Sequence, residues 1–373
     1  MIIHFSILFV IMTAAFIWGK NIRRKKIFCI ANGYAPYELL GPLLPWLLVF
    51  GYIAILAGMR SGMNDTSAYV HSFELSSGTL DEVREILTQD QKDAAFYVLQ
   101  SLFKGFISDD YHAWFFLFSI IESIALIHIL RRECVDFTTA CFYFFASTLY
   151  YNYFSMMRQW LAVVILFAGG LLIKKNKTIS YILLCLIMSQ FHTSALLFIP
   201  VYFMVRGNAW GTKQNIIIGL FAIGLTLLNP VLAGMESVLQ DTTYDYVIDT
   251  MQTSSGSSAI RIIIAAVPVI LSWIHKDEIT GRMINISANM SLLNLLLTVL
   301  ATFTSGLYVI RLSVYTNMYN LILYPYLLTV CIKGRNRQII KLGFYVFYFL
   351  FYVYQMVHQG AFGYSSDILG VYN

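Results

Sequence analysis

Apolar runs of membrane-spanning length alternate with short polar segments along most of the chain. A run of roughly 18–20 apolar residues forms a helix that crosses a hydrocarbon core of about 30 Å. The pattern therefore predicts an all-α polytopic membrane protein with about twelve transmembrane helices. Their expected ranges are 2–18, 36–58, 113–130, 137–154, 156–173, two short helices within 178–206, 214–233, 259–275, 285–303, 308–331 and 339–356.

The distribution of basic residues predicts the orientation of these helices. Lys and Arg accumulate in the cytoplasmic loops of membrane proteins. With both termini outside, 18 of the 25 Lys and Arg fall in the six predicted inner segments, and the alternation holds at every turn. The first basic run, residues 20–26, follows its apolar run, whereas a secretory signal carries its charge before the apolar part. We therefore expect a multi-pass protein of the cytoplasmic membrane.

The composition supports this class and excludes others. Of the 373 residues, 58% are hydrophobic and 12% are charged, about half the charged fraction of a soluble domain. The net charge of +5 is divided among small clusters, which argues against a nucleic-acid partner and fits lipid-facing loops. The sequence contains no HExxH, DxD, Walker or GxSxG motif, so we expect no metal and no cofactor.

Polar residues concentrate in two predicted outer loops within a single domain, residues 1–373. The first loop, 59–112, contains apolar residues at helical spacing between 79 and 106, which predicts an amphipathic helix or helix pair along the membrane surface. Thr79 and Glu82 have the spacing of a capping box. The second loop, 234–258, contains four acidic residues and no basic one.

Seven basic residues fall on the predicted outer side, and four of them lie at helix ends or just within spans: Arg60, Arg158, Arg261 and Arg311. An arginine inside a membrane usually faces a partner or a wet cavity, because its burial near the bilayer centre costs about 2.5 kcal/mol or more. Guanidinium groups bind phosphate and pyrophosphate bidentately. These arginines therefore suggest an anion site, and the alternatives are snorkelling to lipid headgroups or pairing with a loop carboxylate.

Two further residues are candidates for proton transfer. Asp65 could act as a general base beside Arg60, or it could be the N-cap of a helix that begins there. His192 lies at the expected outer tip of the 178–206 hairpin, where its imidazole could exchange a proton or hydrogen-bond as a cap. Further polar groups expected to contact a substrate are Tyr69, Gln159, Tyr315 and Tyr319.

Four stretches of the chain resemble one known family. RSGMNDTSAY (60–69), MMRQWLA (156–162), SQFHTSALLFIP (189–200) and IRLSVYTNMYNLILYPY (310–326) are similar to the EpsG family of bacterial membrane proteins, within the wider Wzy-type polysaccharide polymerases. The family often has Gly-Thr before the aspartate of the first stretch, where this chain has Met63-Asn64.

The resemblance implies a GT-C-like glycosyltransferase that acts on the outer face of the bacterial membrane. It implies an exopolysaccharide, capsule or O-antigen polymerase that uses glycans linked to undecaprenyl pyrophosphate. A chain-length regulator and a flippase of the same pathway would be partners. Arg60, Arg158 and Arg311 would then stabilise the departing diphosphate, Asp65 or His192 would be the base, and Arg261 would bind substrate.

The sequence also permits other functions. A lipid-linked glycan ligase, or another polyprenyl-dependent glycosyltransferase, would use the same diphosphate site. A transporter or flippase of anionic substrates would show charges at the membrane midplane, broken helices and repeat symmetry, of which the sequence shows only the short hairpin. A non-enzymatic scaffold would not need clustered arginines.

Overall fold

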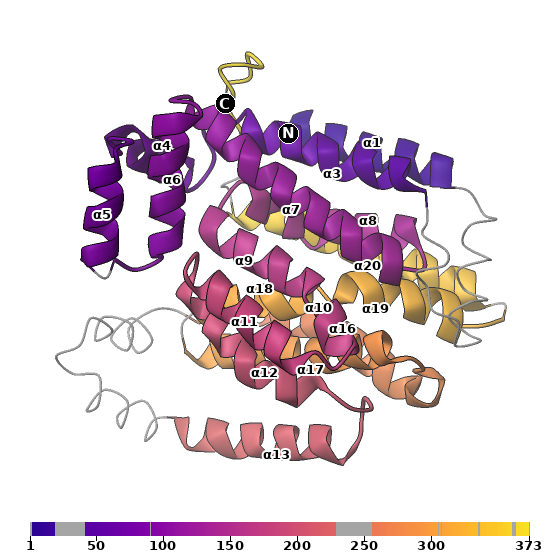
Figure 1. The fold of residues 1–373 in the computed structure, drawn as a ribbon. Coiled ribbons are helices and arrows are strands. Elements are labelled where there is room, and N and C mark those ends of the chain that lie inside the picture. The colour runs from indigo at the N-terminus through magenta and orange to yellow at the C-terminus, as the bar shows by residue number, and fades with distance from the viewer. Residues whose placement is uncertain are drawn as a thin grey trace. The chain divides into compact units, whose positions relative to one another are not determined.

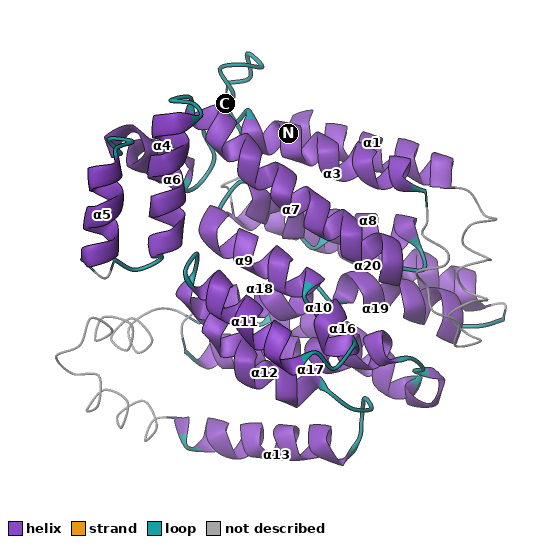
Figure 2. Cartoon of the chain, in the orientation of Figure 1, coloured by secondary structure: helices purple, strands orange, loops and turns teal. Residues whose placement is uncertain are grey.

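The computed structural model describes residues 2–18, 42–89, 91–228, 256–304, 306, 308–334, 336–359 and 363–372. Helices joined by loops make up these residues, and the extended pairing among them consists of isolated bridges (Figures 1 and 2). The predicted all-helical class is confirmed for this part of the chain. The basic run 20–26, the start of the second predicted span and most of the predicted loop 234–258 lie outside the described residues.

Contacts divide the chain into two compact units, residues 1–199 with 324–373 and residues 200–323. The first unit contains α1 (Ile2–Trp18), α3 (Leu43–Gly58), α4 (Thr66–Leu75), α5 (Leu80–Thr88), α6 (Ala94–Phe106), α7 (Tyr111–Glu133), α8 (Phe137–Ala146), η2 (Leu149–Tyr153), α9 (Met157–Ala168), α10 (Gly170–Lys174), α11 (Thr178–Ser189), η3 (Thr193–Leu197), η5 (Leu327–Cys331) and α20 (Asn336–Gln359). The expectation of a single domain stays a prediction.

The second unit contains α13 (Thr212–Thr226), α16 (Ile260–Ile274), η4 (Lys276–Glu278), α17 (Arg282–Phe303) and α18 (Tyr308–Asn317). Helices α12 (Phe198–Val205) and α19 (Asn320–Tyr326) each run across a boundary between the units. Within the second unit, the buried Asn289 side chain donates to the Val205 carbonyl at 2.9 Å and joins α17 to the end of α12. The unit is thus held by buried polar contacts as well as by apolar packing.

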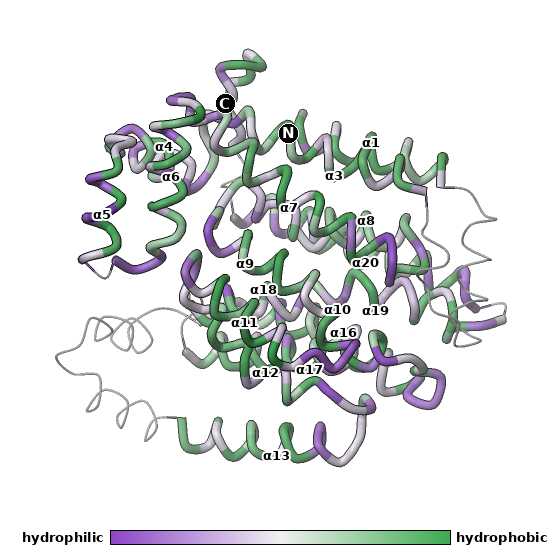
Figure 3. The backbone as a smooth tube through the Cα atoms, viewed as in Figure 1, coloured by the Kyte–Doolittle hydropathy of each residue, from purple (hydrophilic) through white to green (hydrophobic). Residues whose placement is uncertain are grey.

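Four helices among the described residues are long and apolar enough to cross a membrane: Tyr111–Glu133, Met157–Lys174, Arg282–Phe303 and Asn336–His358. The first has 23 residues, which at 1.5 Å per residue give about 35 Å. Large apolar side chains remain exposed on other helices, including Phe5, Phe9 and Phe16 of α1. Figure 3 shows hydrophobic residues along the helices and hydrophilic ones mainly in loops. A surface this apolar suits lipid rather than water.

Several predicted spans are interrupted helices. The expected span 137–154 consists of α8 followed by the 3₁₀ turn η2, and the expected span 308–331 consists of α18, α19 and the π-helical turn η5. Pro325 lies inside α19 immediately before that turn, and proline removes a helical hydrogen bond at its position. The residues predicted as a hairpin, 178–206, form α11, η3 and α12, with residues 190–192 between α11 and η3.

The long predicted loop contains three helices, of which α5 and α6 form a hairpin (Figure 1). The Thr79 hydroxyl accepts a hydrogen bond from the Glu82 N–H at 3.3 Å, as the capping-box spacing predicts. The Glu82 carboxylate reaches the Gly78 N–H at 3.0 Å and the Ser101 hydroxyl at 2.8 Å, so it also ties the start of α5 to α6. These hydrogen bonds outweigh the effect of partial burial and lower the pKa of Glu82.

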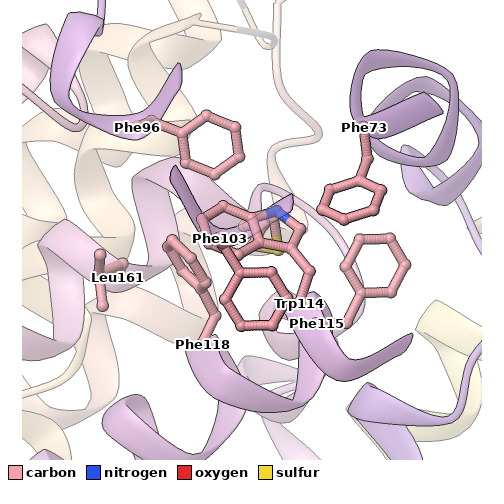
Figure 4. Packing of buried hydrophobic residues seen from close by; sticks show 8 residues of the cluster. Phe73, Phe96, Phe103, Trp114, Phe115, Phe118 and Leu161 are labelled. Carbon is pink, nitrogen blue, oxygen red and sulfur yellow. The ribbon is translucent and has the colours of Figure 1, made fainter. Parts of the chain in front are cut away.

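An aromatic core fastens this hairpin to the long helices. Its buried residues are Phe73 of α4, Phe96 and Phe103 of α6, Trp114, Phe115 and Phe118 of α7, and Met157 and Leu161 of α9 (Figure 4). Rings such as Trp114 and Phe118 meet edge to face with centroids 4.6 Å apart, an arrangement that adds to the energy of apolar burial. The core therefore determines where the first turn of α6 meets the first turn of α9.

The chain near its C-terminus packs against the segment that follows α3. Ser365 pairs with Gly62 in an isolated antiparallel bridge, and the Ser61 N–H donates to the Ser365 carbonyl at 2.8 Å. The buried Tyr364 hydroxyl donates to the Leu56 carbonyl at 2.8 Å. A Cβ atom on Gly62 would lie 2.3 Å from the Ser365 hydroxyl, so this close approach favours glycine. Residues 363–372 thus support the loop that leads into α4.

Candidate functional site

Arg158 lies in the first turn of α9, with 29% of its side chain exposed. One guanidinium nitrogen, Nη1, donates to Asp93 Oδ2 at 3.0 Å and to the Tyr97 hydroxyl at 3.0 Å. The guanidinium carbon lies 5.6 Å from the ring centroid of Phe96, close enough for a cation–π contact. Arg158 is therefore held by α6 and keeps part of its surface accessible.

Asp93 precedes α6 and has a left-handed backbone conformation, with φ 59°. Its side chain is only 2% exposed and does not cap α6. Besides Arg158, Asp93 contacts the backbone N–H of Thr193 at 3.2 Å and the Thr193 hydroxyl at 3.3 Å, both through Oδ1. Asp93 thereby joins three segments that are distant in the sequence.

The charge of Asp93 follows from these partners. Burial raises the pKa of this carboxyl, but His192, Arg158 and the Thr193 N–H together lower it below its ordinary value of 3.8. Because the folded-state pKa lies below the unfolded value, the stabilisation by Asp93 is present above about pH 3.8 and is lost as the pH falls through the lowered pKa. Asp93 is therefore an anion at neutral pH.

His192 lies at the tip between α11 and η3, where the sequence predicted it. Its Nδ1 atom is buried and lies 3.6 Å from Asp93 Oδ2, while 26% of the side chain is exposed. The exposed part of the ring therefore belongs to atoms other than Nδ1. The ring caps no backbone N–H of η3, so the capping alternative is not the one that the structure adopts.

Tyr69 and Asp65 come from α4 and the turn before it. The Tyr69 hydroxyl is hydrogen-bonded to Arg158, and burial raises the pKa of this phenol although the guanidinium opposes the shift. Asp65 is partly buried at the N-cap position of α4, where its side chain makes no capping hydrogen bond. It lies close enough to Tyr69 and Tyr151 to affect both phenols electrostatically. Four predicted site residues, Asp65, Tyr69, Arg158 and His192, thus share one neighbourhood.

Arg60 lies deeper in the same unit and is only 1% exposed. It donates to the Ala57 carbonyl and, from Nε, to the Thr66 hydroxyl at 3.2 Å, and it lies 4.1 Å from the Phe115 ring centroid. Burial lowers the pKa of Arg60 to about 10, against the opposing charge of the buried Glu122, so Arg60 stays protonated at neutral pH. Snorkelling to lipid headgroups is therefore wrong for Arg60, whose hydrogen bonds go to a hydroxyl and a backbone carbonyl inside the protein.

The five remaining predicted site residues belong to α9 and to the second unit. Gln159 is buried in the first turn of α9. The other four belong to the second unit: Arg261 in α16, Arg311 and Tyr315 in α18, and Tyr319 just before α19. Both arginines are partly buried, whereas Tyr315 and Tyr319 are buried. Their membership of the same site as Arg158 stays a prediction.

Asp93 and Tyr97 were missed in the sequence analysis. Both belong to a stretch, QKDAAFYV, that reads as the polar edge of an amphipathic helix. Their link to Arg158 and His192 depends on contacts across 61 to 100 residues of sequence, for which the spacing of apolar residues contains no signal. A carboxylate directly before a helix is usually an N-cap, so the sequence pattern gives no reason to consider Asp93 a site residue.

Tyr69, Asp93, Tyr97, Arg158 and His192 form what we call the polar cluster. Neither this cluster nor any other part of the described chain brings three His, Cys, Asp or Glu side chains together as a metal site. The chemistry available to the cluster is that of its own side chains: a partly exposed guanidinium, a partly exposed imidazole, a buried carboxylate and phenol hydroxyls. Such a set can bind an anion and exchange a proton at adjacent positions.

The fold and the cluster together define a multi-pass helical membrane protein with a polar site at the ends of its helices. The chain belongs to the EpsG family, whose model matches residues 43–367. This membership indicates a function of the polysaccharide-polymerase type with a lipid-linked glycan as substrate. Comparison with the curated proteins and comparison with the solved structures each gave no match.

Proposed function

We propose that this protein polymerises the repeat units of an exopolysaccharide, capsule or O-antigen on the outer face of the cytoplasmic membrane. The growing glycan, linked to undecaprenyl pyrophosphate, is the donor, and a hydroxyl of a lipid-linked repeat unit is the acceptor. The observation that carries the proposal is the partly exposed Arg158 beside the partly exposed His192 in a member of the EpsG family. These are an anion-binding group and a proton-accepting group side by side.

The reaction forms one glycosidic bond and breaks one bond to a phosphate. The acceptor oxygen attacks the anomeric carbon of the donor glycan, the bond between that carbon and the diphosphate oxygen breaks, and undecaprenyl pyrophosphate leaves. The hydroxyl proton passes to the protein base. Negative charge grows on the leaving diphosphate, so a fixed cation beside it lowers the barrier. The proposed mechanism uses neither a metal nor a nucleotide.

We assign the roles as the family resemblance implies. Arg158 stabilises the leaving diphosphate together with Arg311, and Arg261 binds substrate. His192 or Asp65 accepts the hydroxyl proton, and the partly buried Tyr69 contacts the sugars. Gln159, Tyr315 and Tyr319 are buried and are not assigned to sugar contacts. Arg60 is enclosed by protein, and we assign it to stabilising the 60–66 turn through its hydrogen bond to Thr66.

The main experiment measures chain elongation in vesicles that contain the purified protein and undecaprenyl-pyrophosphate-linked repeat units from the source strain. Removal of one charge-stabilising donor costs on the order of 10²–10³ in rate. Because lysine cannot form the bidentate contact, Arg158→Lys and Arg311→Lys are each expected to lose about that factor while the protein still folds. Full-length polymer at normal rates from both variants would show that the diphosphate assignment is wrong.

The proposed topology has twelve spans, both termini outside and the 59–112 loop outside. Lys92 is exposed on the turn between α5 and α6, and Cys134, Cys141, Cys185 and Cys331 are buried. A Lys92→Cys variant in intact cells should therefore react with a membrane-impermeant maleimide. Asn176→Cys, on the predicted inner turn between α10 and α11, should react only after the cells are opened. The reverse result would overturn the orientation.

A further inference from the structure

We propose that Asp93 is a positioning residue that holds His192 through Nδ1, so that Nε2 of His192 accepts the proton of the acceptor hydroxyl. The inference rests on the proposed function and deepens it, because it selects His192 over Asp65 as the base. It also assigns a role to a carboxylate that the spacing of residues in the sequence does not reveal.

The first support is the direction of the His192 ring. Nδ1 is buried and faces Asp93 Oδ2 at 3.6 Å, a separation that exceeds a hydrogen bond and lies within ion-pair distance. A carboxylate beside one ring nitrogen favours the proton on that nitrogen and leaves the other free to accept one. In a substrate-free enzyme such a contact is often long and shortens when substrate binds.

The second support is the position of Asp93 itself. Only 2% of its side chain is exposed, and both oxygens are engaged, Oδ2 by Arg158 at 3.0 Å and Oδ1 by Thr193 at 3.2 Å. A carboxylate so enclosed does not reach a sugar hydroxyl. It can act only on the groups that it contacts, which are the proposed base His192, the proposed diphosphate ligand Arg158, and Thr193 at the start of η3.

The third support is the backbone conformation that Asp93 adopts. A non-glycine residue with positive φ is uncommon and usually held by its surroundings. Here the Ala95 N–H donates to the Gln190 carbonyl at 3.0 Å, two residues from Asp93 and two from His192. The start of α6 and the 190–192 turn are therefore fixed to each other at the point where the carboxylate meets the imidazole.

The test is a double-variant cycle of elongation rates in the vesicle assay described above. His192→Gln is expected to lose about 10²–10⁴ in rate, the usual contribution of a general base. Asp93→Asn keeps the size of the side chain and removes its charge, and loss of a carboxylate that orients a histidine costs on the order of 10- to 100-fold. If Asp93 acts through His192, the double variant is no slower than His192→Gln alone.

Two controls separate positioning from a merely structural role. Asp81→Asn changes an exposed aspartate of α5 that pairs with Arg84 at 3.2 Å, and it should elongate at the normal rate. Asp93→Glu restores the charge and should recover part of the rate that Asp93→Asn loses, whereas a simple packing defect would not be relieved by the longer side chain.

The outcomes distinguish this inference from the proposed function. Asp93→Asn at the normal rate, or losses that multiply in the double variant, would overturn the role of Asp93 and leave the polymerase proposal standing. His192→Gln at the normal rate would overturn the inference in the same way, provided that Arg158→Lys still loses activity. A wild-type protein that makes no polymer from lipid-linked repeats would overturn both.

Discussion

Two arginines of the first unit lie close together in the fold and have opposite surroundings. Arg60 is enclosed, with Thr66, Phe115 and a backbone carbonyl around its guanidinium and the buried Glu122 nearby. Arg158 is nearly one-third exposed and is held by Asp93, Tyr97 and Tyr69. Met157 separates them: its sulfur lies 4.0 Å from Arg60 Nη2, and Arg158 is the next residue.

The difference shows how one residue type can be enclosed at one position of a unit and partly exposed at another. An enclosed charge is expensive unless every part of it is satisfied, so Arg60 fits a supporting role. A charge that is held from one side and exposed on the other retains capacity for a ligand, so Arg158 fits an anion-binding role. Substitutions at the two positions should therefore affect different measurements.

The largest expected effect is on stability at Arg60. Arg60→Met removes an enclosed guanidinium together with its hydrogen bonds to the Ala57 carbonyl and the Thr66 hydroxyl, and each buried polar group left without a partner costs about 1–3 kcal/mol. Arg158→Met should cost less, about 1–2 kcal/mol, because the buried Asp93 keeps Thr193 and His192 as partners. Unfolding in mixed micelles titrated with SDS measures both free energies. Equal losses at the two positions would remove the distinction between them.

A smaller loss is expected at Thr66, which accepts from Arg60 Nε at 3.2 Å. Thr66→Val conserves shape and leaves a buried donor unsatisfied, which costs about 1–3 kcal/mol. The same titration measures the change, and the buried cysteines provide a second probe through their reactivity with a thiol dye on heating. A neutral Thr66→Val variant would mean that water reaches Arg60.

At the partly exposed Arg158, Tyr97→Phe removes one hydroxyl that accepts a hydrogen bond from the guanidinium at 3.0 Å. The site is partly exposed, so water can replace the hydroxyl, and the expected loss is about 1 kcal/mol, or roughly fivefold in elongation rate. The free energy of unfolding should stay nearly constant. A large loss of stability with unchanged elongation would show that Tyr97 and Arg158 stabilise the fold, as Arg60 does, and do not act on the substrate.

The smallest effect is expected at Arg84, an exposed arginine whose ion pair with Asp81 joins side chains that are 79% and 91% exposed. Surface pairs of this kind contribute about 0–1 kcal/mol. Arg84→Gln should therefore change neither the unfolding free energy nor elongation by a measurable amount. A clear effect on elongation would extend the substrate contacts to α5.

The sequence by itself determined the class of the protein, because helix formation and membrane insertion are local properties of apolar runs. The runs at 113–130 and 285–303 correspond to α7 and α17 within a few residues. The Thr79 cap and the turn at His192 were also predicted, since each depends on a few consecutive residues. The interruption before η5 was not, although Pro325 was visible, because membrane helices can continue through proline.

The composition of the polar cluster was decided only by the tertiary structure. Arg60 follows an apolar run and Arg158 begins one, and nothing local shows that the first is enclosed against Phe115 of α7 while the second is partly exposed. Asp93 became a candidate only because the aromatic core of Phe96 and Trp114 brings α6 against α7 and α9. Burial and charge pairing are sums over neighbours distant in the chain, and the folded arrangement alone supplies those neighbours.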